Sequence, residues 1–226
     1  MIMKWICPLL ILVLTTVLAG PASATTIYDT SLASPSNPAT PGCYNGSGCE
    51  NAGFTVSTDG TTELGLSAII RHVGPAPEAG DEYFVPAGTS GGYAIWDYTF
   101  SIDTQPNGIG SATLSSYTYQ LTLTDLTTNA TLSFNPLTIP DNALHGSSGA
   151  QNSENFSFSG VGTPGFNPNL QDDYQITLSE YSGISLVNSD SIQVDAESPE
   201  PGTFFLFGAG CIGIAFLARN RGAFRI

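Results

Sequence analysis

The chain has 226 residues, a formal net charge of −14 and 41% hydrophobic residues, which fits one ordinary domain or two small ones beside targeting segments. Arg71 is the one basic residue between positions 25 and 198, against eighteen acidic residues, so this stretch carries a net charge of −17. Such a surface repels the phosphates of nucleic acids and of anionic lipids, which excludes nucleic-acid binding.

Residues 1–24 have the three parts of a secretory signal peptide. Lys4 provides positive charge, an almost unbroken apolar run follows, and Ala22 and Ala24 supply the small residues of a cleavage site. We therefore expect export by the Sec machinery and a mature chain that begins at Thr25. An uncleaved membrane anchor is the alternative, but the apolar core is short and the cleavage pattern follows it directly.

Two cysteines of the exported part, Cys43 and Cys49, bracket a turn-prone Tyr-Asn-Gly-Ser-Gly. In an oxidising compartment this spacing favours a local disulfide. A loop this short gains about 2 kcal/mol from closure. A metal-binding pair is the alternative, but no third or fourth Cys or His stands near it in the sequence.

Alternation of apolar and polar residues marks the strands of the exported domain. The clearest cases are residues 96–103, 116–125 and 174–179, where aromatic or aliphatic side chains occupy every second position. A period of two puts those side chains on one face of a strand. Shorter strands are expected at residues 54–57, 64–73, 82–85, 131–134, 155–159 and 191–195.

Clusters of Gly, Pro, Asn and Ser separate these segments, as at residues 88–92, 105–108 and 162–169. No helical period of useful length appears in the domain, and no repeat of 20–50 residues. We therefore predict an all-β domain over residues 25–197, folded as an antiparallel β-sandwich or a jelly roll.

Arg71 and His72 stand together at the end of a predicted strand. We expect Arg71 to form an ion pair with a carboxylate at the strand edge, and an arginine that binds a ligand is the alternative. The second histidine of the chain, His145, stands in Asp-Asn-Ala-Leu-His-Gly and is expected to be an exposed loop residue.

The sequence offers no complete set of residues for serine or zinc catalysis. A serine hydrolase requires a histidine beside its nucleophile, and His72 and His145 are the two candidates. The Gly-Thr-Ser-Gly-Gly of residues 88–92 is similar to a serine-protease nucleophile loop, but lacks its preceding Asp, and no Gly-x-Ser-x-Gly is present. Without a second histidine at helical spacing, no zinc site is defined. We expect no enzyme activity, no catalytic residues and no cofactor.

A glycosidase is an alternative, because it needs only two carboxylates at a defined separation. The glutamates of the domain are sufficient in number, but none lies in a motif that marks it. The candidates are Glu63, Glu78, Glu82, Glu154 and Glu180.

Weak calcium binding is a second alternative, since Ca²⁺ takes clustered oxygen ligands. Asp59, Asp81-Glu82 and Asp172-Asp173 stand in or beside predicted loops. Solvated loop charge explains the same residues, and the sequence contains no EF-hand loop.

The C-terminal tail predicts a transmembrane helix. Residues 203–218 carry no charge, and sixteen helical residues span roughly 24 Å, which flanking residues can extend across a bilayer. Arg219, Arg221 and Arg225 follow the segment, so the positive-inside rule leaves the C-terminus cytoplasmic and the domain outside. A buried core helix is the alternative, but it would not end in an arginine cluster at the chain terminus.

Directly before this helix stands the tripeptide Pro199-Glu200-Pro201. The tripeptide, the Gly-rich apolar helix and the terminal arginines resemble the PEP-CTERM sorting signal, over residues 198–226. The resemblance implies export by a Gram-negative bacterium that makes exopolysaccharide, and cleavage near the tripeptide by an exosortase, a membrane-embedded cysteine protease. It departs from the pattern only in the residues that interrupt the arginines.

The alternatives for the tail are a simple single-pass anchor and a GPI signal. A simple single-pass anchor needs the helix and the arginines but has no use for Pro-Glu-Pro. A GPI signal needs a polar spacer before an uncharged apolar end, and this tail ends in charge.

These features predict a bacterial protein that passes through the inner membrane to the cell surface or the extracellular matrix. Its β-domain is expected to have a structural, adhesive or exopolysaccharide-associated role. The alternatives are a secreted glycosidase and a calcium-dependent sugar-binding module.

Overall fold

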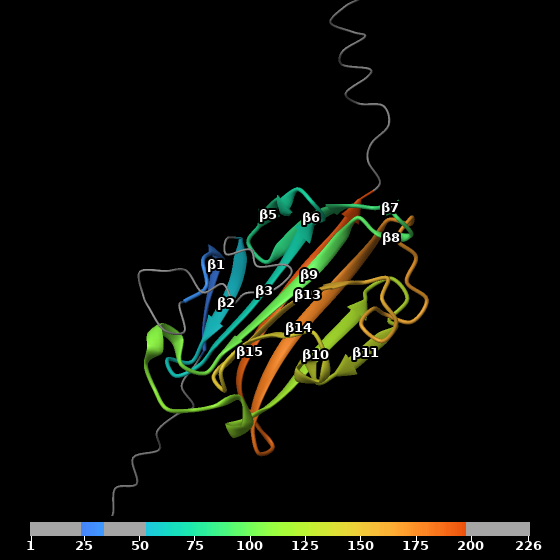
Figure 1. Cartoon of the computed structure of the whole chain (residues 1–226). Coiled ribbons are helices and arrows are strands. Elements are labelled where there is room, and N and C mark those ends of the chain that lie inside the picture. The colour runs from blue at the N-terminus through green and yellow to red at the C-terminus, as the bar shows by residue number, and fades with distance from the viewer. Residues whose placement is uncertain (1–23, 34–52, 198–226) are drawn as a thin grey trace, which may run out of the picture.

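The computed structural model describes residues 24–33 and 53–197, which form two β-sheets packed against each other (Figure 1). The first sheet has the strand order β1-β2-β3-β9-β13-β12, with β4 also paired to β3. Its strands are β1 (Thr25–Thr30), β2 (Phe54–Thr58), β3 (Glu63–Ile70), β4 (Gly74–Pro75), β9 (Trp96–Asp103), β12 (Ala143–His145) and β13 (Gly149–Asn155).

The second sheet has the order β11-β10-β14-β15-β6-β5. Its strands are β5 (Glu78–Ala79), β6 (Glu82–Pro86), β10 (Thr118–Asp125), β11 (Thr131–Phe134), β14 (Asp172–Ser182) and β15 (Ser185–Glu197). The remaining elements are the hairpin of β7 (Thr89–Ser90) and β8 (Tyr93–Ala94) and the short 3-10 helices η1 (Pro106–Gly108), η2 (Leu114–Ser116) and η3 (Pro136–Thr138).

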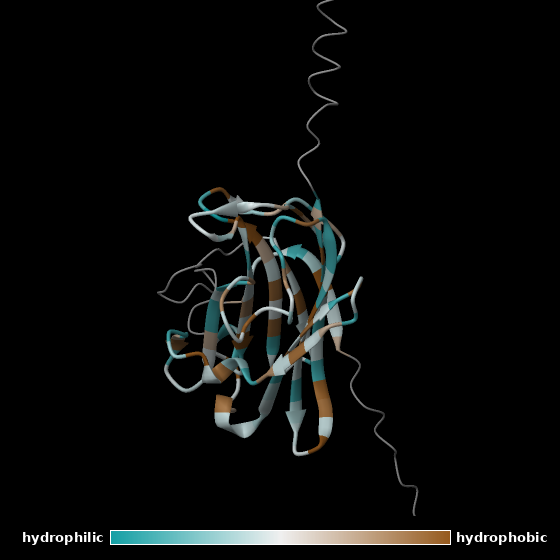
Figure 2. Ribbon diagram, turned by 90° about the vertical axis from the view of Figure 1, so that its right-hand side faces the viewer, coloured by the Kyte–Doolittle hydropathy of each residue, from teal (hydrophilic) through white to brown (hydrophobic). Residues whose placement is uncertain are grey.

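The core lies between the sheets and is built from the alternating residues of the strands. Every second side chain of β9 points into it, from Trp96 to Ile102, and these side chains are fully buried. The same alternation buries apolar residues of β10 and β14 on the facing sheet, and Figure 2 shows its bands of hydrophobic and hydrophilic residues along the strands. The prediction of an all-β domain is confirmed.

Three features differ from the predicted strands. The strand expected at 64–73 ends at Ile70, because the chain turns at His72, whose φ is +62°. The strand expected at 155–159 is instead β13, which ends at Asn155, where the chain turns away. The pairing is not purely antiparallel, because β6 runs parallel to β15.

Part of the face of the first sheet that points away from the core is buried as well, and it carries both polar and apolar side chains. Glu63 and Asp103 are cross-strand neighbours on this face and are less than 9% exposed. Leu32 lies against Gly65, where an added Cβ would come within 2.6 Å of its Cδ2. The backbone N–H of Ala33 donates to Glu63 Oε1 at 2.8 Å, so the segment that follows β1 crosses this face.

Several predictions fall outside the described residues and stay predictions. They are the signal peptide with Ala22 and Ala24, the disulfide between Cys43 and Cys49, and the tail with Pro199, Glu200, Pro201, Arg219, Arg221 and Arg225. Within residues 24–33 and 53–197, the structure contains no helix that is long and apolar enough to cross a membrane.

Candidate functional site

Arg71 forms the expected ion pair. Its Nε lies 3.5 Å from Oδ2 of Asp97. Asp97 belongs to β9, the next strand of the same sheet. The guanidinium also lies over the ring of Tyr93, 5.6 Å from the ring centroid. Tyr93 in turn makes an edge-to-face contact with Phe158, with ring centroids 5.2 Å apart. Arg71 thereby supports a pair of exposed aromatic rings.

The two histidines lie at opposite ends of the first sheet. His72 follows β3 where β3 pairs with the start of β9, whereas His145 pairs through Gly149 with Asp103, the last residue of β9. Seven residues of strand separate these positions by about 23 Å, so the histidines cannot share one site. The expectation that His145 lies in an exposed loop is wrong, because it is half-buried in β12. The Gly-rich 88–92 segment is the β7–β8 hairpin.

Two of the five candidate glutamates, Glu180 and Glu63, serve the fold. Glu180 is fully buried between the sheets, where it accepts hydrogen bonds from the hydroxyls of Thr62 and Tyr119. Glu63 accepts the bond from Ala33 described above. Among the five glutamates, Glu154 alone lines one of the two pockets described below.

The carboxylates considered for calcium do not gather into one site. Asp59 closes the turn between β2 and β3, where its Oδ1 accepts from the backbone N–H groups of Thr61 and Thr62, both at 2.8 Å. Asp172 and Asp173 begin β14 instead of lying in a loop. The described part of the chain brings together no group of three or more His, Cys, Asp or Glu side chains able to hold a metal ion.

Two adjoining pockets lie along the loop that follows β13. The loop is tightly folded: a Cβ on Gly162 would lie 1.8 Å from the carbonyl oxygen of Phe156, so no other residue fits there. The Tyr98 hydroxyl, from the core, donates to the Val161 carbonyl at 3.1 Å. Asn155 fixes the start of the loop, because its Nδ2 donates to two carbonyl oxygens. One belongs to Ala94, just before β9, and the other to Trp96, the first residue of β9.

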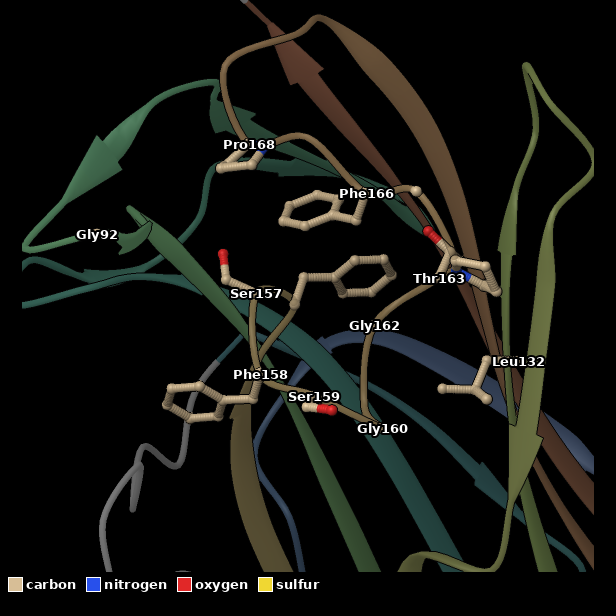
Figure 3. Close-up of a pocket in the computed structure, with 13 residues that line it drawn as sticks. Gly92, Leu132, Ser157, Phe158, Ser159, Gly160, Gly162, Thr163, Phe166 and Pro168 are labelled. Atoms are coloured by element: carbon tan, nitrogen blue, oxygen red, sulfur yellow. The ribbon is translucent and has the colours of Figure 1, made fainter.

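The first pocket has a volume of about 460 Å³, and its lining includes three phenylalanines beside glycines, prolines and hydroxyl-bearing residues. Figure 3 shows Ser157, Phe158 and Ser159 on one arm of the loop, with Phe166 opposite and Leu132 of β11 at the side. Beneath it, Phe156 packs within a cluster of buried and half-buried rings. The Thr163 hydroxyl is buried at the wall of this pocket and has no hydrogen-bond partner among the described residues.

The second pocket, of about 370 Å³, shares Phe158, Ser159 and Gly160 with the first. It also contains two carboxylates: Asp141, before β12, and Glu154, in β13. The β12–β13 hairpin brings these two residues into one wall. Its other lining residues are Phe134, Thr138, Ile139, Pro140 and Val161.

Glu154 is 5% exposed, and no described residue donates a hydrogen bond to its carboxylate. Burial, and then the negative charges of Asp141 and Asp97, raise its pKa to about 7. Asp141 is exposed, and its Oδ1 accepts from Asn152 Nδ2 at 3.1 Å. A buried carboxylate beside like charges and without a donor favours a cation or a hydrogen-bond donor that enters the pocket.

No sequence motif marks the residues of these pockets. Asp141 begins the Asp-Asn-Ala-Leu-His-Gly segment that is expected to be a loop, and Phe158 lies in a predicted strand. Glu154 was named only as one of five glutamates. The pocket depends on the fold of the 156–171 loop, which no local pattern reveals.

The fold defines an acidic all-β domain, and a comparison with protein families identifies its tail. Residues 199–221 match the PEP-CTERM protein-sorting motif, which confirms the resemblance expected of the C-terminal tail. No curated protein and no solved structure matches the chain. The motif implies an exported, membrane-transiting protein that is sorted by an exosortase.

The sorting motif begins very close to the end of the fold. The last strand, β15, ends at Glu197, and the match begins two residues later at Pro199.

Proposed function

We propose that this protein is a non-enzymatic domain of the cell surface or extracellular matrix that associates with exopolysaccharide. The tail of residues 203–218 crosses the inner membrane once, with the domain outside, until an exosortase cuts near Pro199-Glu200-Pro201. The observation that carries the proposal is the position of the motif, because a cut there removes none of the described strands and leaves both described sheets intact.

The sorting step is tested by comparing the wild type with Glu200→Ala in the producing bacterium, by cell fractionation and intact-mass measurement. We expect wild-type protein outside the inner membrane without residues 202–226, and the variant retained with its full tail. Glu197→Ala is the matched control, since it removes the same charge three residues earlier, and it should be processed normally. If the wild type and Glu200→Ala both keep the full tail in the inner membrane, the tail is a simple anchor.

Association with exopolysaccharide is tested separately, by cosedimentation of the released protein with polymer isolated from the same culture. We expect the wild type to sediment with the polymer and to stay in solution without it. If the protein is processed but never sediments with the polymer, the sorting proposal stands and the proposed association with exopolysaccharide is wrong.

A glycosidase is the second candidate, and the pair Glu154 and Asp141 favours it. A buried carboxyl group with a raised pKa, beside an exposed carboxylate in the same pocket, is the arrangement of a general acid and its partner. Release of reducing ends from exopolysaccharide, abolished by Glu154→Gln, would establish it. A polymer that keeps its length after prolonged incubation would exclude it.

A further inference from the structure

We propose that the pocket between β13, η3 and the 156–171 loop binds a sugar unit with a free amino group, such as a glucosamine residue of a glycan chain. The inference rests on the proposed association with exopolysaccharide and specifies the chemistry of the unit that is bound.

The carboxylates argue for a positive charge on the ligand. Glu154 is more than nine-tenths buried, lines the pocket and receives no hydrogen bond from a described residue, while Asp141 lines the same wall. Arg71, the one cation of the domain, is already paired with Asp97. An ammonium group placed between Glu154 and Asp141 would satisfy the buried carboxylate and relieve the repulsion between the two.

The remaining lining argues for a sugar ring. Phe158 is 40% exposed at the border of the two pockets, and its ring is held in place by Tyr93. An exposed aromatic face packs against the C–H face of a pyranose, and it also attracts an ammonium group. The hydroxyls of Thr138 and Ser159 line the pocket and can exchange hydrogen bonds with sugar hydroxyls.

The charge of the whole domain narrows the class further. With a net charge of −17 between residues 25 and 198, the domain attracts cationic chains and repels glycans that carry carboxylates or phosphates. The part of the glycan chain that lies outside this pocket can continue into the first pocket, because the two pockets share Phe158, Ser159 and Gly160.

The experiment is isothermal titration calorimetry of the full exported chain, purified in mild detergent, with three ligands. These are a glucosamine tetramer, an N-acetylglucosamine tetramer and tetralysine, at low salt and pH 7. We expect the glucosamine tetramer to bind at least tenfold more tightly than either of the other two. The N-acetyl ligand removes the charge but keeps the ring, and tetralysine keeps the charge but removes the ring.

Two variants locate the site. Glu154→Gln keeps the size of the side chain and should weaken glucosamine binding about tenfold or more. Phe158→Ala should also weaken binding, whereas Glu197→Gln, which removes a charge at the exposed end of β15, should leave it within twofold. Melting curves of each variant show whether it is folded.

Binding that is absent, equal for tetralysine or the N-acetyl tetramer, or insensitive to Glu154→Gln would overturn the inference. Failure of the proposed function looks different, since the protein would then also fail to sediment with its own exopolysaccharide. A protein that sediments with the polymer but ignores glucosamine keeps its function and uses another surface.

Discussion

Ser57 and Asn188, 131 positions apart in the chain, join the two sheets by a reciprocal pair of hydrogen bonds. The Ser57 hydroxyl donates to Asn188 Oδ1 at 2.8 Å, and Asn188 Nδ2 donates to the Ser57 carbonyl at 3.2 Å. Both side chains are buried. A polar link at this depth specifies how β2 faces β15, because each partner would be costly to bury alone.

Replacement of Asn188 by Ala should therefore lower the free energy of unfolding by about 2–3 kcal/mol, since it leaves the Ser57 hydroxyl without its acceptor. Urea unfolding followed by tryptophan fluorescence measures the change, because Trp96 lies in the core. Ser189→Ala, at the half-buried neighbouring position, is the control and should cost less than about 1 kcal/mol. Equal losses in the two variants would contradict the assigned role of Asn188.

The stability of the domain should fall as the pH rises from about 4.5 to about 7. Burial raises the pKa of Glu63 to about 7 and that of Asp103 to about 6, and it also raises the pKa of Glu180 and Asp190. In this range the folded state binds more protons than the unfolded state, so the free energy of unfolding decreases with pH.

The shift at Glu63 alone, from 4.5 to about 7, corresponds to roughly 3 kcal/mol. Urea unfolding at pH 5 and pH 8 tests the expected direction, and Glu63→Gln should reduce the difference between the two. A domain that is more stable at pH 8 than at pH 5 would show that these carboxyl groups are ionised at little cost in the folded state.

Glu154→Gln should stabilise the protein at pH 8 while it weakens amine binding. The ionised carboxylate is buried beside the charges of Asp141 and Asp97, and a neutral amide removes that repulsion, for a gain of about 1–2 kcal/mol. Thermal melting at pH 5 and pH 8 measures the gain, which should be smaller at pH 5, where Glu154 is protonated. A loss of stability at pH 8 would mean that the pocket already contains a partner for this charge.

Gly162→Ala should disrupt both pockets, because its Cβ would lie 1.8 Å from the Phe156 carbonyl oxygen. We expect a loss of at least about 2 kcal/mol and of glucosamine binding. Gly160→Ala is the matched control: its φ is +87°, but nothing lies within 4 Å of the added Cβ, so it should cost about 1 kcal/mol. Similar costs at the two positions would argue against the close approach at Gly162.

The strands that were predicted well are those with one face in the core. Residues 96–103 and 118–125 show a clean period of two because one side of each strand meets apolar groups and the other does not. The strand β13 was missed because Gly-Ala-Gln-Asn-Ser-Glu-Asn contains no large apolar residue, although it is paired on both sides in the sheet. A side-chain amide of this strand finds a partner on the neighbouring strand: Gln151 Nε2 donates to the Ser101 hydroxyl of β9 at 3.0 Å.

The parallel pair of β6 and β15 could not be predicted, since it joins segments about a hundred residues apart and leaves no local pattern. The same reason hid the candidate site. Asp141 and Glu154 approach through a hairpin that no local pattern marks, and Phe158 becomes exposed only because the chain turns after Asn155.

The place of β15 in its sheet bears on how the protein carries load. The sorting tail continues from a thirteen-residue strand that is paired on one side with β14 and on the other with β6. A pull on the tail along the strand acts in shear on two ladders of hydrogen bonds at once, whereas a pull on an edge strand would break one ladder bond by bond. In the proposed membrane-held state, the domain can therefore resist drag from bound polymer, because the tether transmits that force to a strand that is paired on both sides.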